Sequence, residues 1–252
     1  MIDFFENLPP YLQALIAGII TWLLTALGAA SVFIFKTVNK KILTSMQGFA
    51  AGIMIAASFW SLLQPSIDYG TNGHLPAWLP AAIGFILGGV FIRGLDAVIP
   101  HIHQKIGDKS QYREGVKTSL SKNALLVLAI TLHNIPEGLS IGVAFGIGIQ
   151  NIPEGAALSM PIRAAGATRF KAFNYGQASA IVEPIFATIG AIAIIFITPV
   201  LPYALAFAAG AMIFVVVEEL IPDSQSGNNT DLATLSLMLG FVIMMILDVS
   251  LG

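Results

Sequence analysis

Apolar runs long enough to cross a lipid bilayer recur along the whole chain, separated by short polar segments. A membrane-spanning helix needs about 20 predominantly apolar residues, and eight segments come close to that length. They cover residues 10–35, 42–63, 77–100, 123–143, 145–162, 172–197, 201–221 and 232–251. No stretch remains for a separate soluble domain, so residues 1–252 are predicted to form one all-α, polytopic membrane domain of eight transmembrane helices.

The positive charges orient these segments across the membrane. Most of the 12 Lys and Arg residues fall in three polar segments, around residues 36–41, 105–122 and 163–171. Lys and Arg are enriched in cytoplasmic loops, so we expect these three segments in the cytoplasm. The longest of them is a connector at about 101–122. Both chain termini are then expected outside the cytoplasm, in a multi-pass protein of the cell (inner) membrane.

Composition agrees with a protein whose main solvent is the lipid bilayer. Only 10% of the residues are charged, against about 25% in a typical soluble domain. The chain has no cysteine, which excludes a disulfide framework and a thiolate metal site. It has no basic helix face or aromatic-lined basic patch, so no nucleic-acid partner is expected.

Two nearly identical motifs, HNIPEG and QNIPEG, interrupt the apolar segments at residues 133–138 and 150–155. His133 and Glu137 are four residues apart, as are Gln150 and Glu154, so each pair lies on one face of a helix. A proline before each glutamate frees a backbone carbonyl, which is tolerated at membrane depth only beside protein or a polar cavity. We therefore expect two half-sites, level with each other near the middle of the bilayer.

Further polar side chains accompany these pairs. Asn134 and Asn151 add amide oxygens, and Glu183 in the sequence VEP adds a third carboxylate. Carboxylates within a membrane are costly and indicate a functional site. With no nearby Lys or Arg, they favour a bound divalent cation. The predicted ligands are His133, Asn134, Glu137, Gln150, Asn151, Glu154 and Glu183.

The chemistry of the predicted ligands limits the choice of metal ion but does not select one. Imidazole nitrogen with carboxylate and amide oxygens, and no sulfur, suits Zn²⁺, Fe²⁺, Mn²⁺, Co²⁺ or Cd²⁺. Other polar residues near the cytoplasmic side have roles that the sequence leaves open. These are His101, His103, Glu218 and Glu219.

With HNIPEG, QNIPEG and VEP, and with segments such as AASFWSLLQPSID, MPIRAAG and FAAGAMIFVVVEELIPD, the chain resembles the ZIP (Zrt/Irt-like) family of metal-ion transporters, in its bacterial GufA-like branch. The resemblance implies a helix bundle with inverted repeats and a two-metal site among the fourth, fifth and sixth helices. It assigns one metal position to His133, Glu137, Gln150 and Glu154. It assigns the other to Asn134, Glu137, Asn151, Glu154 and Glu183, the two shared glutamates bridging.

The chain departs from the family pattern at three places. It has Asn151 where some relatives have Asp, and Glu218-Glu219 where many have His-Glu. The two motifs also lie closer together than in relatives, so either the outer helix ends are shortened or residues are missing. The first departure removes a negative charge from the second metal position, which predicts weaker or mainly structural binding there.

We predict a transporter that moves a divalent metal ion, with zinc the first candidate, into the cytoplasm by alternating access to a midplane binuclear site. A membrane-embedded metalloenzyme, using the same residues to activate water, is one alternative. A proton- or sodium-coupled solute carrier is the other. The preferred metal, channel or carrier kinetics, the coupling ion and a homodimer all stay open.

Overall fold

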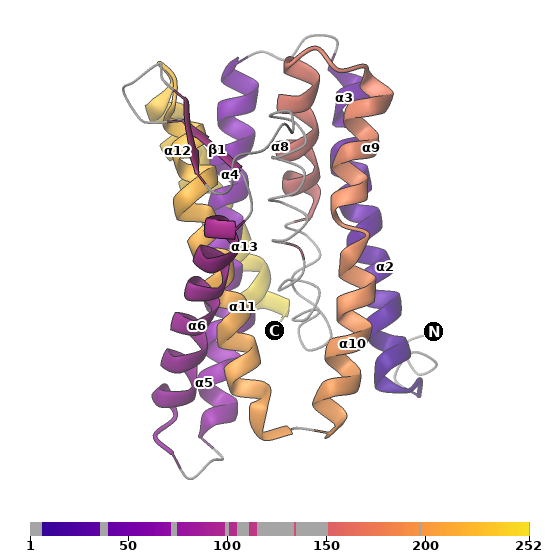
Figure 1. Cartoon of the computed structure of the whole chain (residues 1–252), viewed down its shortest axis with the longest axis vertical. Coiled ribbons are helices and arrows are strands. Elements are labelled where there is room, and N and C mark those ends of the chain that lie inside the picture. The colour runs from indigo at the N-terminus through magenta and orange to yellow at the C-terminus, as the bar shows by residue number, and fades with distance from the viewer. Residues whose placement is uncertain are drawn as a thin grey trace.

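The structure is a computed structural model that describes residues 7–35, 40–71, 75–98, 101–104, 111–114, 134, 151–196 and 198–251. Long helices run roughly side by side and give the molecule an elongated shape (Figure 1). The helices of the first part are α2 (Pro10–Ala29), α3 (Ser31–Ile34), α4 (Lys40–Ala57), α5 (Gln64–Gly70) and α6 (Trp78–Val98). Those of the second part are α8 (Asn151–Ala164), α9 (Arg169–Ser179), α10 (Val182–Phe196), α11 (Leu201–Val215), α12 (Ile221–Gln225) and α13 (Thr230–Leu251).

These helices confirm a polytopic membrane protein. Within the described part of the chain, five helices are long and apolar enough to cross a membrane: Pro10–Ile34, Lys40–Gly70, Arg169–Ala193, Leu201–Gln225 and Thr230–Ser250. A shorter apolar helix covers Trp78–Gly94, and α8 lies where the fifth span was predicted. The predicted fourth span, 123–143, lies outside the described residues except for Asn134.

Two of the long helices contain π-helical segments, which join shorter helices into one. Ser58–Leu63 connects α4 to α5, and Val216–Leu220 connects α11 to α12. Each following helix has a proline in its first turn, and because the helix is continuous at this point, the missing amide hydrogen removes one helical hydrogen bond. The second and seventh spans are therefore longer than predicted and end at Gly70 and Gln225.

The predicted sixth span, 172–197, is divided. α9 ends at Ser179 and α10 starts at Val182. Backbone hydrogen bonds of the tighter, three-residue kind close this turn, from the amide of Ile181 to the carbonyl of Ala178 and from Glu183 to Ala180. The break immediately precedes Glu183, so it determines where this carboxylate enters the bundle.

The predicted cytoplasmic connector contains a short antiparallel ribbon, which the sequence did not lead us to expect. Strand β1 (His101–Gln104) pairs with β2 (Gln111–Glu114). Both strands are polar, so the segment resembles a loop in composition. The pairing satisfies their backbone groups by hydrogen bonds between the strands.

The helices pack in two groups, which stand on opposite sides of Figure 1. In one group α4 runs along α13 and α11 runs along α6, while in the other α2 packs against both α8 and α10. Two glycines permit the close approach in the first group: a Cβ on Gly52 would overlap the carbonyl oxygen of Leu237, and one on Gly210 that of Phe85. Small residues allow such contacts between membrane helices, where packing replaces the hydrophobic effect.

Large apolar side chains cover the outer surfaces of both groups, as a lipid environment requires. On α13 they include Leu235, Leu239, Val242 and Ile246. Only 17% of the membrane window of this helix is buried, against 61% for Lys40–Gly70. The helix that contains α4 is therefore central and α13 is peripheral.

Candidate metal centre

Four of the seven predicted metal ligands belong to the described residues, and all four are buried. Asn134, Asn151 and Glu183 have no exposed surface, and Glu154 is 5% exposed. The other three predicted ligands lie outside the described residues: His133, Glu137 and Gln150. Within the part of the chain that the structure describes, no three His, Cys, Asp or Glu side chains form a cluster suited to a metal.

The two described carboxylates occupy equivalent places on two helices. Glu154 lies in the first turn of α8 and Glu183 in the first turn of α10. A proline precedes Glu154 and another follows Glu183. Proline and acidic residues are both favourable in a first helical turn, which suits the start of α10 at Val182 and places the Glu183 carboxylate inside the bundle.

Asn151 joins three helices through its side-chain amide. Its Nδ2 donates to Oε2 of Glu183 on α10 at 2.7 Å and to Oγ1 of Thr25 on α2 at 3.1 Å. Thr25 itself donates to the carbonyl of Thr21 at 3.2 Å. The hydroxyls of Thr21 and Thr25 are also close to the Glu183 carboxylate. Helix α2, which contains no predicted ligand, therefore forms one wall of the site.

A second contact from α2 holds the break between α9 and α10. Nε1 of Trp22 donates to the backbone carbonyl of Gln177 at 3.0 Å and to its side-chain oxygen at 3.1 Å. The indole thus binds a carbonyl near the end of α9, where helix ends leave acceptors without an intrahelical partner. This contact holds the helix end that leads to Glu183.

Several buried polar atoms of the site have no hydrogen-bond partner, and their chemistry indicates whether the site fits a cation. Among the described residues, both amide atoms of Asn134, Oδ1 of Asn151 and Oε1 of Glu183 have no hydrogen-bond partner. Three of these four atoms are oxygens, which are ligands for divalent metals. Uncompensated buried polar groups are costly, so these oxygens fit a bound cation.

The charges fit a cation as well. Glu154 and Glu183 interact electrostatically, although they lie on different helices. Two buried carboxylates repel each other, and a cation between them would convert this repulsion into attraction. The arrangement of Asn151, Glu154 and Glu183 therefore suits a divalent metal ion.

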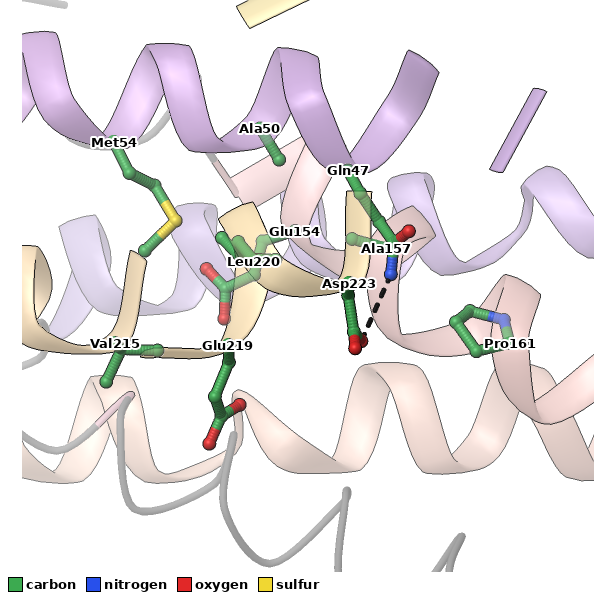
Figure 2. A pocket seen from close by; sticks show the side chains of 10 residues that line it. All are labelled: Gln47, Ala50, Met54, Glu154, Ala157, Pro161, Val215, Glu219, Leu220 and Asp223. Carbon is green, nitrogen blue, oxygen red and sulfur yellow. Dashed lines mark hydrogen bonds between the residues drawn. The ribbon is translucent and has the colours of Figure 1, made fainter. Parts of the chain in front are cut away.

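A pocket lies beside Glu154 and extends along the neighbouring helices (Figure 2). Three elements line it: α4, α8, and the helix that contains α11 and α12. The lining residues are Gln47, Ala50, Met54, Glu154, Ala157, Pro161, Val215, Glu219, Leu220 and Asp223. From Glu154 the pocket extends along α8 toward Arg163 and along α4 toward Lys40, which is the side predicted to be cytoplasmic.

Polar side chains line the far part of this pocket. Nε2 of Gln47 donates to Oδ2 of Asp223 at 3.4 Å, and the contact is drawn in Figure 2. Glu219 also lines the pocket, whereas Glu218 is exposed. The two glutamates whose roles the sequence left open are thus in different environments.

Sequence reasoning missed the residues of α2 and of the pocket. Thr21 and Thr25 are four residues apart and thus on one helix face, which was the available signal. Gln47 and Asp223 stand near the polar ends of their spans and resembled ordinary helix ends. His101 and His103 belong to β1, and their roles stay open.

Comparison with known proteins gives a family match. The family model described as "ZIP Zinc transporter" matches residues 108–248 of the chain. This range includes both repeated motifs and Glu183.

Individual relatives match over nearly the whole chain. Zinc transporter ZIP11 of Xenopus tropicalis is 39% identical over 334 residues, covering 98% of this chain and 99% of the relative. Zinc transporter GufA of Myxococcus xanthus is 37% identical over 256 residues, covering 94% and 98%. Zinc transporter ZIPB of Bordetella bronchiseptica is 36% identical over 255 residues, covering 95% and 81%. These alignments are longer than the 252 residues of the chain, so the relatives contain residues without a counterpart here.

Proposed function

The chain belongs to the ZIP zinc transporter family, and on that premise we propose that it transports a divalent metal ion, zinc in the first place, into the cytoplasm. The observation that carries the proposal is the meeting of Asn151, Glu154 and Glu183 inside an apolar bundle. The relatives are named zinc transporters, which decides against the metalloenzyme alternative. The carried ion is the substrate of the protein.

We propose that the ion binds at the middle of the membrane. The first position comprises His133, Glu137, Gln150 and Glu154. The ZIP resemblance adds the second position of a binuclear site, with Asn134, Glu137, Asn151, Glu154 and Glu183, which would share two glutamates with the first. Support comes from the described members, since Asn151 contacts Glu183 and Glu154 acts on it electrostatically. Fe²⁺, Mn²⁺, Co²⁺ and Cd²⁺ suit the same donor atoms.

The helices support an inverted repeat. Residues 49–55 read FAAGIMI in α4 and residues 207–213 read FAAGAMI in α11. Each of these helices continues through a π-helical segment into a short helix with proline in its first turn. Each also packs along another long helix, α13 for α4 and α6 for α11. We propose that the two sequences mark two repeats in an eight-helix bundle.

The two helix groups support alternating access. Three of the four described predicted ligands, Asn151, Glu154 and Glu183, lie on α8 and α10, in the group with α2. Helices α4 and α11 belong to the other group. Transporters built from repeats open to each side in turn by movement of one bundle against another. We propose that the group of α2, α8 and α10 moves against the group of α4, α6, α11 and α13, with the metal between them.

The pocket is the proposed exit to the cytoplasm. It starts at Glu154 and ends near Gln47 and Asp223, and Glu219 lies between. Lys40 and Arg163 lie beyond this end on α4 and α8, which supports its cytoplasmic orientation. With this topology the protein lies in the cell (inner) membrane and both termini face outside.

Metal content tests the binding part of this proposal against a proton- or sodium-coupled carrier, which needs no metal. The purified chain, dialysed against zinc and analysed for elements, is expected to retain zinc. Glu154→Gln should lower the zinc content, because it removes a buried charge without changing side-chain size. Glu218→Gln is the matched control, since Glu218 is exposed. Equal zinc in Glu154→Gln and the wild type would contradict the proposed site.

A further inference from the structure

The hydrogen bonds of Asn151 are directed opposite to those that a metal ligand needs. A carboxamide binds a cation through its oxygen, because the nitrogen has no free lone pair for a metal. Here the nitrogen, and not the unpartnered oxygen, faces Glu183, a ligand of the proposed second position, and donates to its Oε2 at 2.7 Å. Its other contact, to Thr25 at 3.1 Å, holds the amide in the same orientation.

The amide takes over part of the role of a cation. Glu183 is fully buried, and a buried carboxylate needs a donor or a positive charge. The N–H group of Asn151 supplies a hydrogen bond to that charged acceptor, and such bonds are among the stronger ones in proteins. An aspartate at the same place would have no donor and would add a third carboxylate beside Glu154 and Glu183.

We propose that Asn151 is a placeholder: its hydrogen bond to Glu183 closes the second position of the binuclear site, so that this position stays empty and the protein carries one ion at the midplane. A second ion would have to break this bond and turn the amide so that Oδ1 faces the metal. Thr25 opposes that rotation, because it accepts from the same nitrogen. The inference rests on the proposed function and specifies how many ions the site holds.

Zinc stoichiometry in the purified full-length chain tests the proposal. Equilibrium dialysis with zinc, followed by elemental analysis, gives the ions per chain, and Glu154→Gln gives the background from other sites. The wild type is expected to hold one Glu154-dependent ion. Asn151→Asp should hold two, because the donor is replaced by a carboxylate. The double variant Asn151→Asp with Glu183→Gln should return to one.

The outcomes separate this inference from the proposed function. Two Glu154-dependent ions in the wild type would overturn the placeholder and leave metal transport intact. One ion in a folded Asn151→Asp variant would also overturn it. A wild type without any Glu154-dependent ion would overturn the proposed function, and the inference with it. If Asn151→Asp does not fold, the wild-type count alone decides.

Discussion

At the scale of single residues, the site depends on side chains that carry no charge. Thr25 accepts a hydrogen bond from Asn151, and Asn151 in turn donates to Glu183. All three are buried. Buried polar networks of this kind hold each member in one orientation as long as every partner is present. The geometry of the carboxylate therefore depends on a hydroxyl from another helix.

Thr25→Val tests this dependence. It keeps the side-chain shape but removes the oxygen that accepts from Asn151, so a buried N–H loses a partner, at a cost of about 1 kcal/mol. Zinc affinity, measured by titration of the purified protein, is expected to change about fivefold. Thr188→Val is the matched control, because the hydroxyl of Thr188 bonds only to the carbonyl of Pro184 on its own helix, at 2.8 Å. Equal changes in both variants would speak against the network.

Acidity should weaken zinc binding. Histidine and carboxylate ligands bind metal in their deprotonated forms, so protons compete with zinc for the same atoms. Lowering the pH is therefore expected to lower zinc affinity, and raising it to restore the affinity. Titrations across a pH series measure the effect. An affinity that rises as the pH falls would contradict a site of glutamates and histidine.

The sequence predicted part of this site for a clear reason. Polar residues such as Asn151, Glu154 and Glu183 are conspicuous in apolar helices, and the structure brings these three together, although their role as ligands stays a prediction. Thr25 and Trp22 are common residues in such helices. Their importance arises from contacts with residues more than a hundred positions away, which periodicity does not reveal.

At the scale of helices, the position of the site depends on how closely α2 and α8 approach. A Cβ on Gly28 would overlap the carbonyl oxygen of Ile152, and a Cβ on Gly155 would overlap that of Thr25. Both glycines therefore let backbone meet backbone. Asn151 directly precedes Ile152 in α8, so the same close packing brings its side chain to Thr25 of α2.

Gly155→Ala is expected to disturb the site by separating these two helices. Overpacking costs about 1–3 kcal/mol, and the added methyl group has only backbone to displace. Both thermal stability and zinc affinity should fall, as measured by thermal unfolding and titration. Gly94→Ala in α6 is the control, because no atom lies within 4 Å of its added Cβ. A fully stable, zinc-binding Gly155→Ala variant would contradict the contact.

The lengths of the apolar runs predicted where helices lie along the chain. They did not predict where those helices are interrupted. Seven of the eight predicted spans contain helices described here, although their ends differ by several residues. The π-helical segment at Ser58–Leu63 and the break at Ala180 have the same apolar composition as the helices around them. Such features depend on neighbouring helices and on hydrogen bonds, which the hydrophobic pattern does not record.

At the scale of the whole molecule, the proposed exit route depends on a pocket that lies between the two helix groups. Its walls come from both helix groups, α8 on one side and α4 with α11 and α12 on the other. The Lys and Arg pattern predicts its orientation, but the pocket itself requires the packing of distant helices. Movement between the groups would open or close it.

Because the chain has no cysteine, a cysteine introduced into this pocket would be its single thiol and could be labelled selectively. Ala157→Cys and Leu220→Cys, on opposite walls, are expected to react with a charged, membrane-impermeant thiol reagent added from the cytoplasmic side. Zinc should slow both reactions by occupying the route. Ile86→Cys is the control, because Ile86 is 63% exposed on the apolar surface and should lie in lipid. Labelling from the outer side alone would reverse the proposed orientation.

Zinc flux tests the central claim most directly. Proteoliposomes that contain the wild-type chain are expected to take up zinc well above protein-free vesicles. Vesicles with the Glu137→Ala and Glu154→Ala double variant, at equal protein content, should take up no more than the protein-free ones, because both shared carboxylates are gone. Zinc uptake that survives in the double variant would contradict transport through this site.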